Sequence, residues 1–268
     1  MKNHSSNILH SELFESGVLR LTLDDQNSRN ALSDDMLAHL TSALTAAAAN
    51  DVVRVIVLAG KGPAFCAGHD LKQITAARAQ EDGGKDYFKR LFDSCGGLMQ
   101  LIVSMPKPII AEISGVATAA GCQLVASCDL AFAADSAKFA TPGVNIGLFC
   151  STPMVALSRN VAHKHAMEML LTGEFLCADR AQEIGLINRS VIPDQLSAIT
   201  MALANKIASK SSMTLAVGKQ AFYRQAEMSL YDAYDYSSQV MVENMLTHDA
   251  NEGIGAFIDK RPPAWKDQ

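Results

Sequence analysis

Two short runs of small residues are the parts of this sequence best suited to chemistry. The first is AFCAGHDLK, from Ala64 to Lys72, and the second is SGVATAAGCQ, from Ser114 to Gln123. Each places glycine or alanine where a strand is expected to give way to a loop or a helix, which leaves backbone N–H groups without partners. Two such amides directed at one oxygen atom would form an oxyanion hole for an enolate or a tetrahedral intermediate. The alternative interpretation is that the small residues only let a strand and a helix pack closely.

Side chains close to these runs offer few groups for proton transfer or nucleophilic attack. The imidazole of His69 titrates near neutral pH and is able to donate or accept a proton. A single histidine is weak evidence, and we favour a ring that packs on the pocket wall. Cys150 and Ser151 would be nucleophiles only beside a base, and no neighbouring sequence identifies one. Asn145 is interpreted as a structural amide that satisfies backbone groups.

The composition predicts one globular chain with a large core. The chain has 268 residues, of which 49% are hydrophobic and 19% are charged, and its formal net charge is -5. This charge gives no basic field for nucleic acid, and no apolar run reaches the roughly 18 residues of a membrane span. The six cysteines lack zinc-type spacing, so reduced thiols and no metal are expected. The polar N-terminus favours a cytoplasmic location and leaves the mitochondrial matrix open.

Strands and helices alternate in the first half of the sequence. The predicted strands cover residues 18–23, 52–58, 109–113 and 130–133. Helices are predicted at 36–49 and 88–105, and a further helix starts within 116–121. The charged, glycine-containing segment Gln73–Tyr87 is interpreted as a mobile surface excursion. Later patterns are mainly helical, with a long run from 212 to 250, so we expect a mostly parallel sheet and a helical subdomain.

Taken together, several segments resemble the crotonase superfamily, typified by enoyl-CoA hydratase, and most resemble its enoyl-CoA hydratase domain-containing group. The matching stretches are RNAL at 29–32, AFCAGHDLK at 64–72, PKPIIAEISGVATAAGCQLVASCDLAFA at 106–133, FATPGVNIGL at 139–148, LLTGEFLCADRAQEIGLIN at 170–188 and EGIGAFIDKRPPAW at 252–265. The resemblance implies an α/β fold with a crotonase-type β-β-α spiral core at 1–205. It also implies a C-terminal helical region at 206–268 that forms homotrimers or dimers of trimers.

A substrate and a set of site residues are implied by the same resemblance. The substrate is an acyl-CoA thioester, with no separate cofactor, whose carbonyl oxygen lies between the backbone amides of His69 and Ala120. Ala120 stands where the family has glycine, and its amide still serves if the backbone conformation is accessible to alanine. Further residues match positions that bind coenzyme A, the last of them from a neighbouring subunit. They are Arg29, Ala31, Ala67, Lys72, Gly121 and Lys260.

Two positions depart from the family pattern. Enoyl-CoA hydratases use two glutamates to hold and deprotonate the water that adds to the double bond, and those positions carry Gln123 and Gly143 here. Gln123 cannot act as a general base, and Gly143 has no side chain. Decarboxylase relatives share the Gly-His-Asp triplet at 68–70. They also have a tyrosine near the position of Cys150, and that tyrosine is missing here. The carboxylate of isomerase relatives is missing as well, because Cys150, Ser151 and Thr152 stand in that segment.

Two functions stay open on the sequence. In the first, the chain is an acyl-CoA enzyme that stabilises a thioester enolate, hydratase-like by family but acting as a decarboxylase or hydrolase. In the second, the chain is a catalytically impaired acyl-CoA-binding oligomer with a regulatory or scaffolding role. Turnover of an acyl-CoA separates them, because only the first function predicts it.

Overall fold

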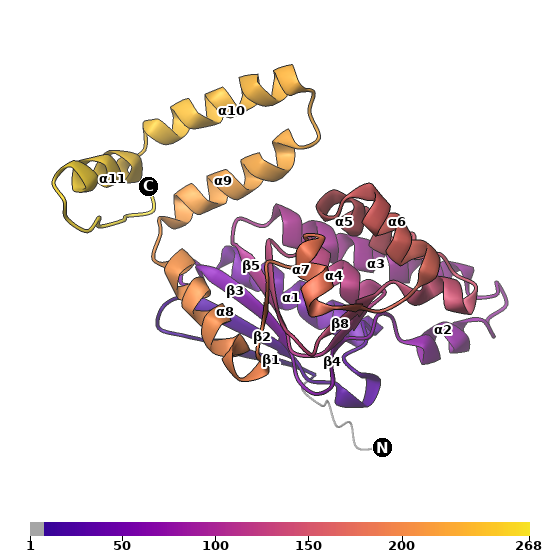
Figure 1. Ribbon diagram of the computed structural model, residues 1–268. Helices are drawn as coiled ribbons and strands as arrows, with labels where there is room; N and C mark the ends of the chain where they lie inside the picture. Colours follow the sequence, from indigo (N-terminus) through magenta and orange to yellow (C-terminus); the bar gives the residue numbers. More distant parts are fainter. Residues whose placement is uncertain (1–7) are drawn as a thin grey trace.

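The computed structural model describes residues 8–268 and contains a two-sheet core from which three C-terminal helices extend (Figure 1). The larger sheet has six strands in the order β1-β2-β3-β5-β7-β10. Its neighbours pair in parallel, except that β1 pairs antiparallel with β2. The central strands are buried and almost wholly apolar, as parallel strands covered on both faces require. The strands are β1 Leu9–Leu13, β2 Val18–Leu23, β3 Val55–Gly60, β5 Ile109–Ile113, β7 Leu130–Ala134 and β10 Arg189–Val191.

A smaller sheet shows how the chain spirals. Its four strands, in spatial order, are β4 Ala64–Cys66, β6 Val116–Thr118, β8 Lys138–Ala140 and β9 Leu176–Cys177. The strands β4, β6 and β8 each follow a strand of the larger sheet after a short connection, and each is followed by helical structure. This repeated order is a β-β-α spiral, so the fold class expected from the resemblance is confirmed.

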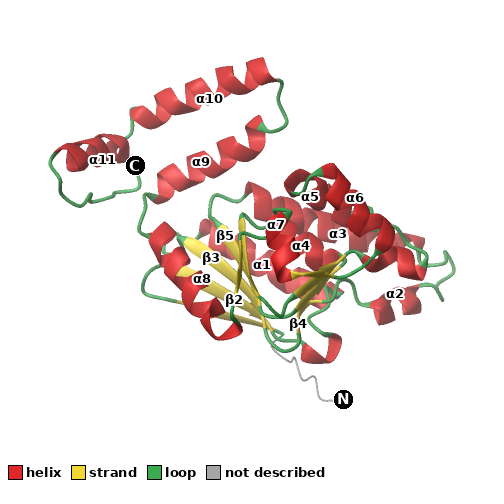
Figure 2. Cartoon of the chain, viewed as in Figure 1, coloured by secondary structure: helices red, strands yellow, loops and turns green. Residues whose placement is uncertain are grey.

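Helices cover both faces of the larger sheet (Figure 2). On one face, α8 packs Ala204 and Ala208 against valines of β2 and β3. On the other face, α1, α3 and α4 share the main hydrophobic cluster with the sheet. The core helices are α1 Asp34–Ala49, α2 Leu71–Ala77, α3 Lys85–Ser104, α4 Ala120–Ser127, α5 Pro153–Asn160, α6 His163–Thr172, α7 Ala178–Glu183 and α8 Pro193–Ala208, with short 3-10 helices η1 Gln26–Ser28 and η2 Pro142–Ile146.

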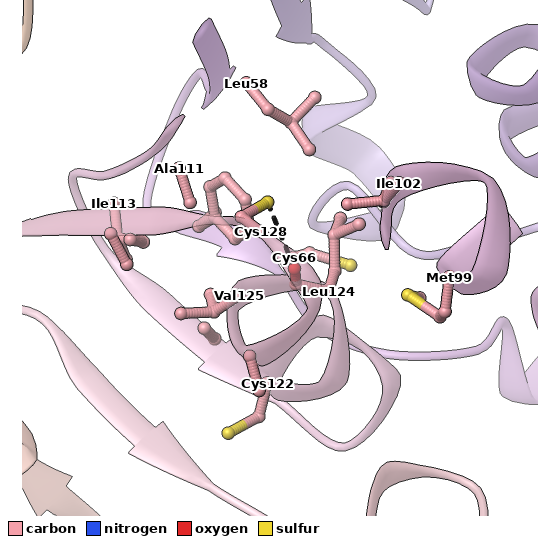
Figure 3. Close-up of a cluster of buried hydrophobic side chains, with 14 of the residues drawn as sticks. Leu58, Cys66, Met99, Ile102, Ala111, Ile113, Cys122, Leu124, Val125 and Cys128 are labelled. Carbon is pink, nitrogen blue, oxygen red and sulfur yellow. Dashed lines mark hydrogen bonds between the residues drawn. The ribbon is translucent and has the colours of Figure 1, made fainter. Parts of the chain in front are cut away.

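Every residue of α4 is buried. Side chains from the larger sheet and from α3 surround this helix, as Figure 3 shows for Leu58, Ile113, Met99 and Ile102. The Sγ atom of Cys128 closes the end of the helix by donating to the carbonyl oxygen of Leu124 at 3.3 Å. Because α4 has neighbours on all sides, its first residues are held in a fixed position relative to both sheets.

The arm consists of α9 Ser212–Gln225, α10 Leu230–Met245 and α11 His248–Ile258, which lead away from the core (Figure 1). Many of its large apolar side chains are exposed, including Tyr231 at 81% and Phe257 at 86%. None of the helices in residues 8–268 is long and apolar enough to span a membrane. Helices α9, α10 and α11 confirm the helical C-terminal region that the sequence predicts.

The last residues of the chain fold back from α11 onto the core. The carboxylate of Asp249 accepts hydrogen bonds from the backbone N–H groups of Lys266 at 2.8 Å and Asp267 at 2.9 Å. The Asp267 carboxylate pairs with Arg54, which precedes β3, at 3.0 Å. The indole of Trp265 donates to the carbonyl oxygen of Ser209 at 3.0 Å. The arm is thus connected to the core at both of its ends.

Several element boundaries differ from the sequence predictions. The segment Gln73–Tyr87 is not a plain surface excursion, because it contains most of α2 and the start of α3. Asp70 caps α2 by accepting from the N–H of Lys72, and Asp82 accepts from the N–H of Asp86 in the first turn of α3. The strand predicted at 52–58 begins only at Val55.

The helical run predicted at 212–250 is divided into α9 and α10 and continues into α11. New helices begin where Ser229 and Thr247 accept hydrogen bonds from backbone N–H groups three residues later. The division of the chain at residue 205 stays a prediction.

Candidate functional site

The two small-residue runs meet where the loop after β4 contacts the start of α4. A Cβ atom added to Gly68 would lie 3.4 Å from the backbone nitrogen of Ala120 and 3.0 Å from the Cβ of Ala119. The carbonyl oxygen of Gly68 accepts from the N–H of Leu32 at 2.7 Å, which fixes the loop on its other side. Within residues 8–268, neither the N–H of His69 nor that of Ala120 donates to a protein acceptor. Two neighbouring backbone donors are therefore available to a ligand.

The backbone is strained immediately before the second of these amides. Ala119, the N-cap of α4, has φ 50° and ψ -118°, a conformation that glycine adopts readily and alanine rarely. Such a residue costs on the order of 1–3 kcal/mol and persists only where its surroundings determine it. Its N–H donates to the carbonyl oxygen of Ala140 at 3.0 Å, and its carbonyl oxygen accepts from the N–H of Gln123 at 3.0 Å. These bonds hold the turn that orients Ala120.

Replacing Ala119 with glycine is expected to raise the free energy of unfolding by about 1 kcal/mol, because glycine relieves the positive φ. Urea unfolding measures the change. The control is Ala120→Gly, which has no positive φ to relieve and should lower stability by up to about 1 kcal/mol. Equal effects of the two changes would contradict strain at Ala119.

The ring of His69 lies between the loop before α1 and helix α3. Its Nδ1 atom is 3.4 Å from the carbonyl oxygen of Leu32, and its edge meets the ring of Phe92 with centroids 5.5 Å apart at 76°. Burial lowers the pKa of His69 below its usual value of 6.5. The Nε2 atom is buried and has no hydrogen-bond partner in the part of the chain that the structure describes. The ring packs against Leu32 and Phe92, but this packing leaves one polar atom unexplained.

Gln123 and Gly143, the two positions at which the sequence resemblance implies missing glutamates, lie in tight packing. Gln123 is 4% exposed, and its Oε1 atom is 4.0 Å from the Sγ atom of Cys95 on α3. A Cβ atom added to Gly143 would lie 2.8 Å from the carbonyl oxygen of Leu148 and 2.9 Å from the Sγ atom of Cys150. No side chain fits at residue 143 unless the following loop moves, so the absence of a carboxylate there is part of the packing.

Replacing Gly143 with alanine is accordingly expected to lower the free energy of unfolding by about 1–3 kcal/mol through overpacking. Denaturant unfolding tests this result. Gly96 on α3 provides the matched control, because a Cβ atom added there meets nothing within 4 Å. Gly96→Ala should raise stability by about 0.5–1 kcal/mol, since alanine favours the helix. A stabilising Gly143→Ala change would contradict the packing described for this loop.

The sulfur and hydroxyl groups near the site are poor nucleophiles. Burial raises the pKa of the Cys95 and Cys122 thiols to about 12 and also raises that of Cys150. Ser151 is exposed, and its hydroxyl donates to the carbonyl oxygen of Phe149 at 3.3 Å. Within residues 8–268, no histidine or carboxylate is hydrogen-bonded to the Ser151 hydroxyl, so the geometry offers it no activating base.

The residues expected to bind coenzyme A fall into two places. The N–H of Ala67 donates to the carbonyl oxygen of Arg29 at 3.1 Å, which joins the loop before α1 to the loop after β4. Lys72 lies in the first turn of α2, directly after this loop, and its side chain is exposed. Lys260 follows α11, on the arm rather than beside the other residues. Ala31 is buried in the loop before α1, and Gly121 is buried in the first turn of α4, next to Ala120.

Sequence reasoning missed three residues that build this region. Asn30 is fully buried and donates to the carbonyl oxygens of Lys61 at 3.0 Å and Ala64 at 2.8 Å, which holds the loop before α1. Phe92 and Cys95 of α3 contact His69 and Gln123. The helical spacing of these α3 residues is visible in the sequence, but it is the same signal that an ordinary core face gives.

Comparisons with known proteins agree with the fold. Residues 13–268 match the family described as enoyl-CoA hydratase/isomerase. Enoyl-CoA hydratase domain-containing protein 3, mitochondrial, of Mus musculus is 48% identical over 94% of this chain and 82% of its own length. The crystal structure of an enoyl-CoA hydratase of Mycobacterium smegmatis has a TM-score of 0.92 and 48% identity, covering 96% of this chain and 98% of that one.

The crystal structure of human enoyl Coenzyme A hydratase domain-containing protein 3 has a TM-score of 0.91 and 44% identity. The match covers 96% of this chain and all of the human one. Family, sequence and structure comparisons thus agree over almost the whole length. The chain belongs to the enoyl-CoA hydratase/isomerase family of the crotonase superfamily and lies close to its enoyl-CoA hydratase domain-containing group.

Proposed function

We propose that this chain binds an acyl-CoA thioester and stabilises its enolate through the backbone amides of His69 and Ala120. The observation that carries the proposal is the contact between the loop after β4 and the start of α4. The N–H groups of His69 and Ala120 in these segments have no acceptor within residues 8–268. Amides fixed in this way stabilise charge as it develops on an oxygen without reorganisation. The strained turn at Ala119 supports the same function, because strain of this kind gathers at ligand sites.

The proposed coenzyme A contacts come from both ends of the chain. Arg29, Ala31 and Ala67 lie in two connected loops, Lys72 lies in the first turn of α2 that follows, and Gly121 lies in the first turn of α4. Arg29 and Lys72 are exposed cations suited to phosphate groups. Lys260 would reach the phosphates of a neighbouring subunit. No further cofactor and no metal is part of the proposal.

We also propose that the arm assembles the chain into homotrimers or dimers of trimers. Large apolar side chains cover the arm, and exposed apolar surface of this kind favours burial against another protein. Sedimentation measures the assembly, and a monomer at micromolar concentration would contradict it. Nucleic acid and membrane partners are not proposed. The proposed location is the cytoplasm, and the mitochondrial matrix is the competing location because the mouse relative is named mitochondrial.

Ordinary hydration of an enoyl-CoA is not the proposed reaction. Gln123 is neutral, and the packing around Gly143 leaves no room for a side chain. We therefore propose chemistry that needs a stabilised oxyanion but not two carboxylates. Decarboxylation would form an enolate, and thioester hydrolysis would form a tetrahedral intermediate, at the same two amides. The second candidate is a catalytically impaired acyl-CoA-binding oligomer with a regulatory or scaffolding role, which the same two positions favour.

Binding and turnover assays on the purified chain test these proposals separately. Calorimetry with butyryl-CoA measures binding, and a panel of crotonyl-CoA, malonyl-type CoAs and saturated acyl-CoAs measures turnover. Turnover of any malonyl-type or saturated substrate supports the enzyme, whereas binding without turnover supports the impaired oligomer. If no CoA ester binds, both proposals fail.

A further inference from the structure

The ring of His69 carries a buried polar atom that the protein itself does not use. Within residues 8–268, the Nε2 atom is inaccessible to solvent and has no hydrogen-bond partner. Buried side-chain nitrogens are almost always paired, so an unpaired one needs an explanation. The ring belongs to the same residue whose backbone N–H is one of the two free amides, so a ligand held at that amide would be bound next to this side chain.

The proton of the neutral ring is assigned by the contact on its other nitrogen. Nδ1 lies 3.4 Å from the carbonyl oxygen of Leu32, and a carbonyl oxygen only accepts hydrogen bonds. Nδ1 therefore carries the proton, and Nε2 presents a lone pair. The contact with Phe92, at 5.5 Å between centroids, holds the ring in this orientation. Nε2 is consequently an acceptor of hydrogen bonds and of protons.

The surroundings keep this ring neutral at neutral pH. Burial lowers the pKa of His69, and the hydrogen bond to Leu32 and the charge of Asp34 on α1 offset only part of this effect. Two uncharged groups contact the ring directly, the carbonyl oxygen of Leu32 in the loop before α1 and the ring of Phe92 on α3. Other side chains of the site do not compete, because Gln123 does not titrate and the pKa of the Cys95 thiol is about 12.

We propose that Nε2 of His69 is the base that removes a proton from the α-carbon of the bound acyl thioester. The C–H bond at the α-carbon breaks, and its proton passes to Nε2. The electron pair moves into the thioester, which becomes an enolate whose oxygen is held by the amides of His69 and Ala120. Return of the proton to the α-carbon reverses the step. The inference rests on the proposed function, since it requires a thioester bound at these amides. It also requires the ring to turn on binding so that Nε2, which is buried without a ligand, reaches the α-carbon and exchanges its proton with water.

The substrate class follows from this step. Any acyl-CoA with a hydrogen on its α-carbon qualifies, whether or not it has a double bond, because the reaction consumes no water, oxidant or reductant. A saturated acyl-CoA is therefore sufficient as a probe. The signature is exchange of the α-hydrogens with solvent.

The experiment follows deuterium incorporation into butyryl-CoA by NMR in D2O. His69→Phe keeps the backbone amide and an aromatic ring against Phe92 but has no Nε2, so exchange should fall by at least about 100-fold. His69→Gln keeps a hydrogen-bonding group that is not a base and should show the same loss. Calorimetric affinity for butyryl-CoA should change by less than about tenfold, or 1.4 kcal/mol, in both variants. Circular dichroism checks that each variant is folded, and His69→Gln serves if His69→Phe is not.

The pH dependence of the exchange rate is a second test, because a ring with a purely structural role would not affect it. Exchange in the unmodified chain should be constant above neutral pH and should fall as the pH drops below 6.5 through the pKa of His69. Exchange that persists in both variants would overturn the inference, as would binding of butyryl-CoA with no exchange in the unmodified chain. Failure to bind butyryl-CoA at all is a different result, because it contradicts the proposed function itself.

Discussion

Gly121→Ala should abolish acyl-CoA binding and lower the free energy of unfolding by about 3 kcal/mol or more. A Cβ atom at residue 121 would overlap the carbonyl oxygen of Cys66 in β4 and would lie 2.9 Å from the Cβ of Cys66. Both obstacles are parts of a fully buried strand, so neither can rotate away as a flexible side chain would. Relief requires α4 to move as a whole, and the amide of Ala120 would move with it.

Calorimetry with butyryl-CoA and urea unfolding measure the two effects of this change. Gly97→Ala is the matched control, since Gly97 is also helical but a Cβ atom there meets nothing within 4 Å. That control should gain about 0.5–1 kcal/mol and keep its affinity. Unchanged affinity in a folded Gly121→Ala variant would show that the start of α4 does not hold the thioester.

Asp129→Ala is expected to lower the free energy of unfolding by about 3–5 kcal/mol. Asp129, just before β7, accepts from the Nζ of Lys219 at 2.8 Å, from the hydroxyl of Tyr223 at 2.9 Å and from the N–H of Ile109 at 2.7 Å. The Lys219 side chain, on α9, is 6% exposed. Among the described residues, its Nζ would keep only the carbonyl oxygens of Ile102 and Lys107 as partners after the substitution. Removing the carboxylate thus leaves a buried cation without its counter-charge.

Because Lys219 and Tyr223 belong to α9, this substitution should also loosen the arm. Limited proteolysis should cut between α8 and α9 sooner in Asp129→Ala than in the unmodified chain. The control is Lys89→Ala, which removes the exposed pair with Asp93 on α3 and should change stability by no more than about 0.5 kcal/mol. If both variants lose the same free energy of unfolding, the buried interaction of Asp129 with Lys219 and Tyr223 does not hold the arm to the core.

The parts of the site that sequence could predict are those whose signal is local. The glycine and alanine runs around His69 and Ala120 are visible in the sequence, and they predict either free amides or close packing of a strand against a helix. The mainly parallel sheet follows from β-branched runs such as β3. Strands of three residues, such as β4, are too short to show an alternation of apolar and polar residues. The smaller sheet therefore could not be predicted from the sequence pattern.

The remaining features depend on contacts between distant residues. Gly143 appears in the sequence only as a missing side chain, whereas the structure shows the Cys150 thiol and the Leu148 carbonyl oxygen in that space. The positive φ of Ala119 is equally hidden, since nothing about an alanine predicts a glycine conformation. The unpaired Nε2 of His69 required the positions of Leu32 and Phe92. Each of these arises from packing that no local pattern encodes.

The fold-back of the C-terminus gives the arm the topology of a closed loop. One end is continuous with α8, and the other returns to the core through Asp267 and Arg54. A single cut in the connection between α9 and α10 would therefore leave two fragments that each keep an attachment to the core. Deletion of the last four residues would remove the contacts of Trp265 and Asp267 with Ser209 and Arg54. Helices α10 and α11 would then be joined to the core only through α9, although the rest of the chain is intact.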